Sequence, residues 1–304
     1  MLTSTGVPVK KRRLSPDRWA PYVFLSPYFI LTAAFFLYPL FYAAILSLHY
    51  TNGPKHRQFV GLDNFRHILS DPDFYQAMKN TTVFAAASVF IQLPMSLGLA
   101  MLLNAKSDRL KGMFRLAIFA PNLVGQVFVG ILFMMLFTPR YGLFNRLTQA
   151  IFGAGIDARW LGDPNLVMPA IVICSLWMYV GFNMIYFLAA LQNIDASLVE
   201  AARIDGAGPI QVFWNVTRPA ITPVATFVVV TSTIGSFNLY ELPNTLLQGA
   251  GPNNSGLFAV TYLYGFFSAQ DLGTAAAVGW VLAAVIFAIS LLQIFISGVS
   301  RRDS

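Results

Sequence analysis

The sequence predicts an all-α integral membrane protein with six transmembrane helices. Of its 304 residues, 56% are hydrophobic and 11% are charged, whereas a soluble domain has about 25% charged residues. Charged residues are also absent from six stretches, each long enough for the roughly 20 apolar residues that cross a bilayer. Because a backbone in hydrocarbon must satisfy its own hydrogen bonds, each stretch is expected to be a helix.

The six stretches follow one another along one membrane domain, residues 22–298. They lie between Arg18 and Lys55, Lys79 and Lys106, Arg115 and Arg140, Asp163 and Asp195, Arg218 and Glu241, and Asp271 and Arg301. Four prolines in the first three spans, Pro27, Pro39, Pro94 and Pro121, predict kinks rather than breaks.

Lysine and arginine are distributed unevenly between the two sides of the membrane. With the N-terminus inside, thirteen of the 20 fall in cytoplasmic segments and seven in outer loops. The positive-inside rule therefore predicts that both termini, a basic segment 1–21 and a short tail 299–304, are cytoplasmic. Such a basic segment is typical of contact with anionic membrane lipid, and no nucleic-acid partner is expected.

Three outer segments connect the spans. The first, with Phe59–Phe65 and Asp71–Phe74, predicts a short amphipathic helix along the membrane surface. The second, residues 138–164, is expected to be partly helical. The third, residues 242–270, is free of charge but rich in turn residues, and only 257–267 is apolar. We expect a surface loop with an interfacial or re-entrant piece there.

The interior of the spans contains only neutral polar groups. Ion-coupled pumps place ionisable residues in the membrane, so a solute moved through this interior is expected to be neutral and driven by an external energy source. The candidate path residues are Tyr179, Asn183, Ser175, Ser236 and Asn238. Amides and hydroxyls beside aromatic rings suit a sugar, although such groups also hold membrane helices together.

The chain offers no sign of an enzyme. It contains no nucleophile–base pair and no cluster of metal ligands, and the single Cys174 is expected to be a small buried apolar residue. We expect no catalytic residue, metal site or cofactor in this chain.

The polar segment 195–220 separates the fourth and fifth spans. Ser197 and Glu200 predict a capping box at the start of a short helix, and Gly206 predicts its end. Pro209 predicts the start of a second short helix, which we expect to end at Arg218-Pro219. The result is a helix–elbow–helix whose apolar face requires a partner, either another chain or its own spans.

Residues Glu200 to Gly208, followed by Pro219, resemble the Glu-Ala-Ala signature of binding-protein-dependent ABC importer permeases. Five further segments look like the carbohydrate-uptake branch of that family: 59–65, 80–81, 99–104, 208–213 and 251–253. Arg218 departs from the pattern, because the family generally has leucine there, and it places a cation at the start of the fifth span.

The resemblance implies a type I importer permease fold in a prokaryotic inner or plasma membrane. It implies that the elbow docks on a cytoplasmic ATPase and carries its motion through Glu200, Ala201, Ala202, Asp205, Gly206, Ala207 and Gly208. The implied partners are a second homologous permease, two ATPase subunits and an extracytoplasmic solute-binding protein. The chain lacks a phosphate-binding Gly-x-x-x-x-Gly-Lys loop, so ATP and Mg²⁺ would be bound by the partner ATPase.

The expected function is permeation of a sugar or oligosaccharide driven by ATP. The alternatives are an importer of glycerol phosphate or a polyol, and an ion-coupled secondary transporter.

Overall fold

The computed structural model describes residues 20–53, 56–104, 109–153 and 158–298. Within them, five helices are long and apolar enough to cross a membrane, and a sixth candidate is a bent helix pair. The five are Pro21–Leu46, Pro72–Leu103, Pro164–Gln192, Pro209–Phe237 and Leu272–Ser297. Most of the predicted basic N-terminus and the predicted tail lie outside the described residues.

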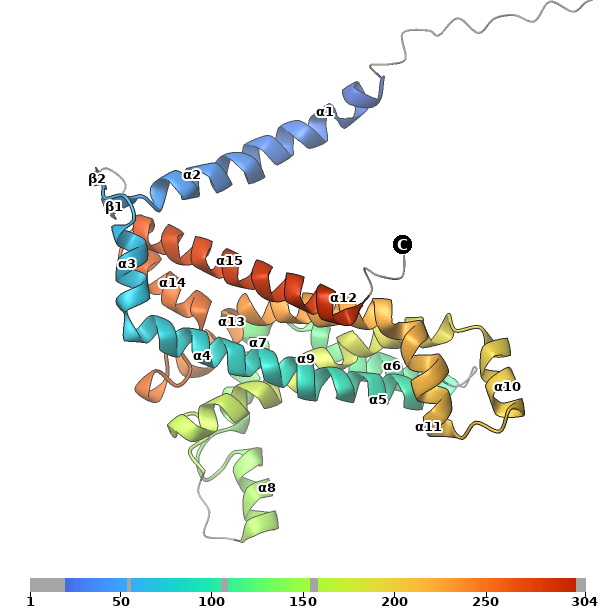
Figure 1. The fold of residues 1–304 in the computed structure, drawn as a ribbon. Helices are drawn as coiled ribbons and strands as arrows, with labels where there is room; N and C mark the ends of the chain where they lie inside the picture. The colour runs from blue at the N-terminus through green and yellow to red at the C-terminus, as the bar shows by residue number, and fades with distance from the viewer. Residues whose placement is uncertain (1–19, 54–55, 105–108, 154–157, 299–304) are drawn as a thin grey trace, which may run out of the picture.

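The helices form an elongated bundle (Figure 1). The spans comprise α1 (Ala20–Thr32), α2 (Tyr38–Leu46), α4 (Pro72–Ala87), α5 (Leu93–Leu103), α9 (Pro164–Gln192), α12 (Arg218–Phe237) and α15 (Leu272–Ser297). The helix formed by α1 and α2 diverges from α15 and exposes apolar side chains all round, as lipid contact would allow.

Three of these long helices contain a π-helical turn just before a proline. The turns are η1 (Ala33–Leu37), η2 (Ser88–Gln92) and η4 (Phe213–Thr217), and Pro39, Pro94 and Pro219 follow them. A proline ring clashes with the carbonyl four residues earlier, which here belongs to the middle residue of each turn. The wider turn accommodates the ring, so the helix continues through the proline.

The third predicted span is not one helix. It consists of α6 (Arg109–Phe119), the 3₁₀ turn η3 (Ala120–Leu123) and α7 (Gln126–Leu136), and the two helices meet at 98°. Pro121 removes a backbone donor inside the turn, and Gly125 takes an extended conformation that starts α7 in a new direction. The predicted kink is therefore a break.

The outer end contains a β-hairpin that the sequence reasoning missed. Strands β1 (His49–Asn52) and β2 (His56–Phe59) pair antiparallel, with His49 opposite Phe59. The predicted amphipathic helix follows as α3 (Asp63–Ser70). The Asn64 amide donates to the carbonyls of Ser47 and His49 at 2.8 and 2.9 Å, and the Thr51 hydroxyl accepts from the Gly273 N–H at 3.0 Å. These bonds tie the hairpin to the start of α15.

The prediction of a surface loop for residues 242–270 is wrong. This segment folds into α13 (Glu241–Leu247), the short turn η5 (Pro252–Asn254) and α14 (Ala259–Ser268). Leu242, Leu246 and Phe258 are buried in the core. The Tyr262 hydroxyl donates to the Asp71 carboxylate at 2.6 Å; burial first, and this bond second, raise the pKa of the Tyr262 phenol.

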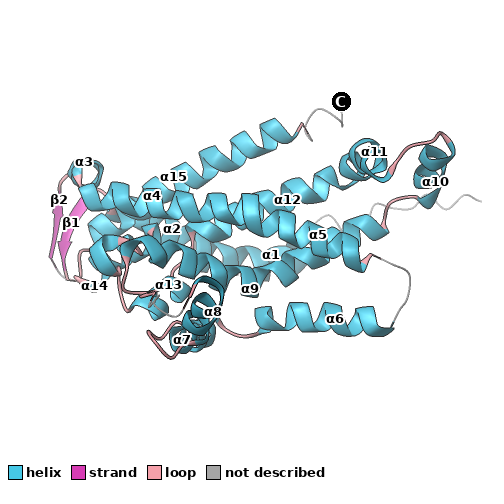
Figure 2. Ribbon diagram, turned by 90° about the horizontal axis from the view of Figure 1, so that it is seen from below, coloured by secondary structure: helices cyan, strands magenta, loops and turns pink. Residues whose placement is uncertain are grey.

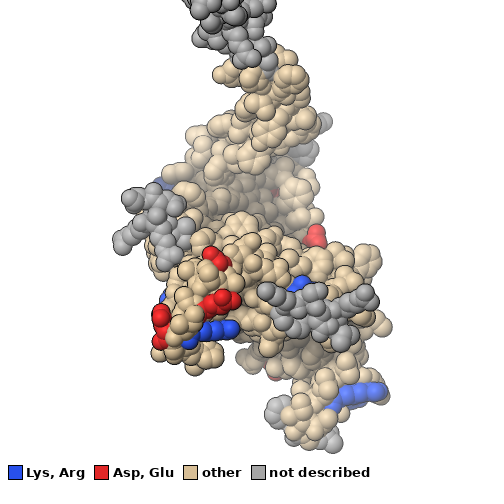
Figure 3. Space-filling view, turned by 90° about the vertical axis from the view of Figure 1, so that its right-hand side faces the viewer, with Lys and Arg blue, Asp and Glu red and all other residues tan. Residues whose placement is uncertain are grey.

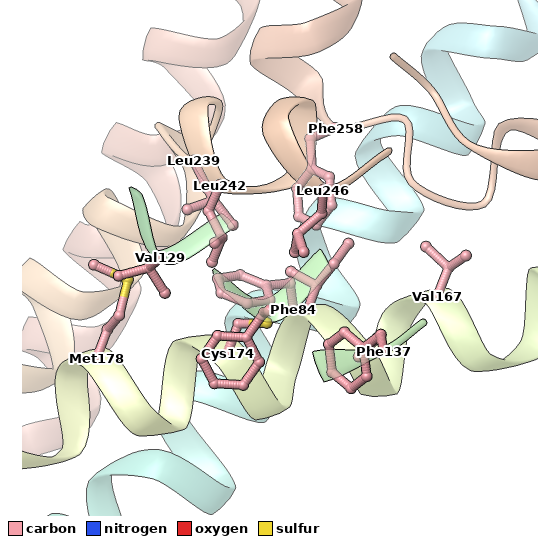
Figure 4. Close-up of a cluster of buried hydrophobic side chains, with 13 residues drawn as sticks. Phe84, Val129, Phe137, Val167, Cys174, Met178, Leu239, Leu242, Leu246 and Phe258 are labelled. Carbon is pink, nitrogen blue, oxygen red and sulfur yellow. The ribbon is translucent and has the colours of Figure 1, made fainter. Parts of the chain in front are cut away.

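The largest core cluster lies where α13 packs between α7 and α9. Figure 4 shows Phe84, Phe137 and Cys174 among its side chains, and Cys174 is fully buried as expected. Nearby, α8 (Leu143–Phe152) confirms that the second outer segment is partly helical, and Phe144 joins it to this cluster. The broken third span and α9 are therefore joined by a continuous buried core.

The two ends of the bundle differ in structure. The hairpin and α3 lie at one end, and α10 (Ala196–Ile204) and α11 (Pro209–Val212) lie at the other (Figures 1 and 2). The described N-terminal end of α1 and the C-terminal end of α15 point toward the α10–α11 end. This arrangement agrees with the prediction that both termini and the segment 195–220 share one side of the membrane.

Candidate functional site

A cavity of about 340 Å³ lies inside the bundle between α4, α7, α9 and α12. Its lining residues are Phe84, Ser88, Gln92, Gln126, Tyr179, Phe182, Asn183, Thr231, Ser232, Gly235, Ser236, Asn238 and Leu239. Apart from the Tyr179 phenol, these described lining residues carry only neutral amides, hydroxyls, aromatic rings and aliphatic groups. The volume is at the lower end of the range for small-molecule sites, about 300 to 1,000 Å³.

Four of the five predicted path residues line this cavity, namely Tyr179, Asn183, Ser236 and Asn238. Tyr179 and Asn183 are four residues apart on α9 and so share one face of that helix. Ser175 is the exception. It is buried behind the wall, where its hydroxyl donates to the Gln92 Oε1 at 3.0 Å.

Sequence reasoning missed the contribution of the second span. Ser88 and Gln92 are both buried in the cavity wall and belong to the π-helical turn η2. The turn changes which residues share a face of the helix, and Ser175 fixes the Gln92 side chain. Pro94, which the sequence showed, is the signal that could have indicated a π turn at this place.

Gln126 reaches the cavity because the third span is broken. It is the first residue of α7, directly after the turn that redirects the chain. Its buried Oε1 has no hydrogen-bond partner among the described residues. Buried polar atoms without a partner are rare and costly, so this oxygen is a point in the wall where the described chain leaves a hydrogen bond unmade.

The remaining polar side chains on α12 are partly satisfied by their own helix. The Ser236 hydroxyl donates to the Ser232 carbonyl at 2.8 Å, and the Asn238 amide donates to the Ile234 carbonyl at 2.9 Å. Each retains an acceptor oxygen. The cavity therefore combines free acceptors with the flat faces of Phe84, Tyr179 and Phe182.

The elbow at the other end of the bundle begins differently from the prediction. Asp195, not Ser197, is the N-cap of α10: its carboxylate accepts from the Ser197 N–H at 2.9 Å. The prediction of a capping box formed by Ser197 and Glu200 is therefore wrong, because the helix starts one residue before Ser197. Bonds from the Ser197 N–H and then from its hydroxyl hold the pKa of the Asp195 carboxyl below its ordinary value.

The prediction that Gly206 ends the first helix of the elbow is confirmed. Its φ is +84°. The Ala207 N–H donates to the Ala202 carbonyl at 2.9 Å and the Gly206 N–H to the Arg203 carbonyl at 3.1 Å. This is the Schellman pattern, which requires a left-handed residue where glycine has no steric cost. A Cβ at Gly206 would meet no described atom within 4 Å, so its surroundings are open.

The second helix of the elbow starts at Pro209 as predicted, and the Gln211 side chain accepts from the Gly208 N–H at 2.8 Å. It does not end at Arg218-Pro219. The π turn η4 accommodates Pro219, and one continuous helix runs from Pro209 to Phe237. That helix joins the elbow to Thr231, Ser232 and Ser236 in the cavity wall.

The elbow is exposed to its surroundings. Among the predicted coupling residues, Glu200, Ala201, Asp205 and Gly206 are exposed, and Ala202, Ala207 and Gly208 are half-buried. Ile204 and Ile210, with 85% and 75% of their surface exposed, flank the glycine turn. Seen from this end, a few charged groups stand on an otherwise neutral surface (Figure 3).

Three curated relatives match nearly the whole chain. The arabinooligosaccharides transport system permease protein AraP of Bacillus subtilis (strain 168) is 35% identical over 287 residues, which cover 93% of this chain and 90% of AraP. The lactose transport system permease protein LacF of Rhizobium radiobacter is 37% identical, covering 94% and 95%. The sn-glycerol-3-phosphate transport system permease protein UgpA of Yersinia pestis is 31% identical, covering 92% and 96%.

A solved structure has the same fold. A chain of a bacterial ABC transporter involved in the import of the acidic polysaccharide alginate superposes with a TM-score of 0.79 at 25% identity, covering 92% of this chain and 95% of that one. Residues 92–301 match the family model of the binding-protein-dependent transport system inner membrane component. The chain therefore belongs to the family of inner membrane components of binding-protein-dependent transport systems.

Proposed function

We propose that this chain is the permease subunit of an ATP-driven importer for a neutral sugar or oligosaccharide. The observation that carries the proposal is the cavity, in which neutral amides and hydroxyls surround a space beside three aromatic rings. Sugars are recognised by such hydrogen-bonding groups together with flat apolar faces. Permeases named for arabinooligosaccharides and lactose are among the relatives.

The elbow supplies the coupling in this proposal. It would dock on a cytoplasmic ATPase through Glu200, Ala201, Ala202, Asp205, Gly206, Ala207 and Gly208. ATP and Mg²⁺ would be bound by that ATPase. Because α11, η4 and α12 form one helix, a displacement of the elbow moves the cavity wall directly. The complete importer would contain two ATPase subunits, a second homologous permease and an extracytoplasmic binding protein.

An anionic solute is the nearest alternative, because UgpA is named for sn-glycerol-3-phosphate. Recognition of a phosphate favours an arginine or lysine in the site, and the described cavity residues include neither. An ion-coupled mechanism is disfavoured for a similar reason, since no carboxylate or histidine is among them.

A solute panel tests the proposal. Two cell lines are compared, one that expresses the full importer and one that expresses all its subunits except this chain. Each is given labelled lactose, a labelled arabinooligosaccharide and labelled sn-glycerol-3-phosphate. We expect uptake of at least one neutral sugar, and not of the phosphate ester, to depend on this chain. Uptake of sn-glycerol-3-phosphate alone would favour the anionic alternative and contradict the neutral-sugar assignment.

A further inference from the structure

A second hollow lies at the elbow end of the bundle, between α12 and α15. It is a groove of about 490 Å³, open at the side, that starts at Trp214 and Arg218 and extends to Val229. Apolar side chains, aliphatic and aromatic together, form most of its wall, including Leu97, Ile221 and Ile296. The groove thus differs from the neutral polar cavity in having a mostly apolar wall and a cation at its mouth, although α12 contributes to both.

The groove is as long as half a bilayer is thick. Arg218 and Val229 are eleven residues apart on α12, which corresponds to about 16 Å along the helix axis. The hydrocarbon core of a bilayer is about 30 Å thick, so one leaflet contributes about 15 Å. An extended acyl chain entering from the elbow end would be accommodated over the depth of its own leaflet.

The mouth of the groove carries a positive charge that forms no ion pair with another described residue. Arg218 is exposed, and its guanidinium carbon lies 4.9 Å from the centre of the Trp214 ring. Within the described parts of the chain, no ion pair joins Arg218 to another residue. Tryptophan concentrates at the membrane interface, and arginine binds phosphate through two parallel hydrogen bonds.

We propose that this groove binds an anionic phospholipid from the leaflet at the elbow end. The phosphate lies against Arg218, the head-group region against the Trp214 ring, and one acyl chain along Ile221, Val229 and Ile296. The lipid would contact the helix that joins the elbow to the cavity, and it would use the residue in which this chain departs from the family pattern.

A hydroxylated solute is the rival occupant. At the deep end, the Gln293 amide donates to the Thr233 hydroxyl at 2.8 Å, and its buried Oε1 has no partner among the described residues. That oxygen could accept from a sugar. The mostly apolar wall and the cation at its mouth favour the lipid, and the experiment separates the two.

The test is native mass spectrometry of the full-length chain in its purified importer, equilibrated with equal amounts of phosphatidylglycerol and phosphatidylcholine of the same acyl chains. The wild type is expected to retain phosphatidylglycerol preferentially. Arg218→Leu should lower that retention about tenfold, the scale of one charge-assisted phosphate contact, whereas Arg218→Lys should keep part of it. Thr226→Phe fills the groove and should lower retention with Arg218 in place.

The matched control is Arg203→Leu, which removes an arginine at the same end of the bundle but outside the groove. Its lipid retention should equal that of the wild type. Equal retention of the two lipids by the wild type, or full retention by Arg218→Leu, would overturn the proposal. Retention of added lactose that is lost in Gln293→Ala, and unaffected by Arg218→Leu, would assign the groove to a solute instead.

Discussion

At the scale of single residues, Asn183 is the most informative side chain of the cavity. It is 6% exposed and lines the cavity on the same face of α9 as Tyr179. A buried amide needs hydrogen-bond partners. A solute bound in the cavity would supply such partners.

Asn183→Ala is therefore expected to lower the affinity of transport without loss of the fold. One neutral hydrogen bond contributes about 1 kcal/mol, equivalent to about a fivefold higher half-saturating solute concentration. Tyr179→Phe should act in the same direction. Uptake kinetics, measured together with recovery of the assembled complex, check this prediction.

Asn165→Ala is the matched control, because it makes the same change on the same helix. Asn165 lies in the exposed first turn of α9, bonded to Asp163, and does not line the cavity. Unchanged uptake by Asn183→Ala and Tyr179→Phe would mean that these groups only pack helices together.

At the scale of elements, the elbow depends on one backbone conformation. Gly206→Val places a β-branched residue at a φ of +84°, at a cost of about 1–2 kcal/mol, and adds bulk to an exposed turn between two isoleucines. The variant should still insert in the membrane, since no span is changed, but should lose the ATPase during purification. Co-purification of the ATPase is the measurement.

Gly53→Val provides the control for strain alone. Gly53 has a φ of +76° and open surroundings, as Gly206 has, but it lies in the hairpin turn at the opposite end. Its variant should retain the ATPase. If Gly206→Val also retains it at the wild-type level, the elbow is not the docking element.

The elements also show which features local sequence signals can determine. Charge-free runs predicted five of the spans, because a charged side chain in hydrocarbon is costly and is therefore rare within a membrane helix. The same runs could not show that Pro121 breaks a helix whereas Pro94 and Pro219 are accommodated by π turns. That outcome depends on whether neighbouring helices leave room to redirect the chain, and this is a tertiary property.

The candidate site was predictable to a similar degree. Helical spacing on α9 identified Tyr179 and Asn183, but it could not show that Ser175 faces Gln92 across an interhelical contact. Gln126 and the burial of Leu242 and Leu246 follow from the broken third span and from α13 packing against it. The position of Gln126 and the burial of these two leucines arise from contacts between segments far apart in the sequence. The turn-forming residues 249–256 gave no indication of those contacts.

At the scale of the whole molecule, one helix runs from the end of the elbow to the wall of the polar cavity. Pro209–Phe237 has 29 residues, so it is about 43 Å long. Its π turn at η4 lies between the elbow and the span, where a flexible joint would otherwise be expected. We expect the helix to transmit displacement of the elbow as a nearly rigid lever.

The most direct test of this account is uptake by proteoliposomes that contain the complete importer and its binding protein. We predict that accumulation of the labelled sugar requires ATP on the side of the membrane where the ATPase lies. It should also require the binding protein on the opposite side. It should persist when ionophores collapse the proton and sodium gradients, because the described cavity residues include no carboxylate or histidine that could carry a coupling ion. Accumulation that needs no ATP and stops when the gradients collapse would contradict the account.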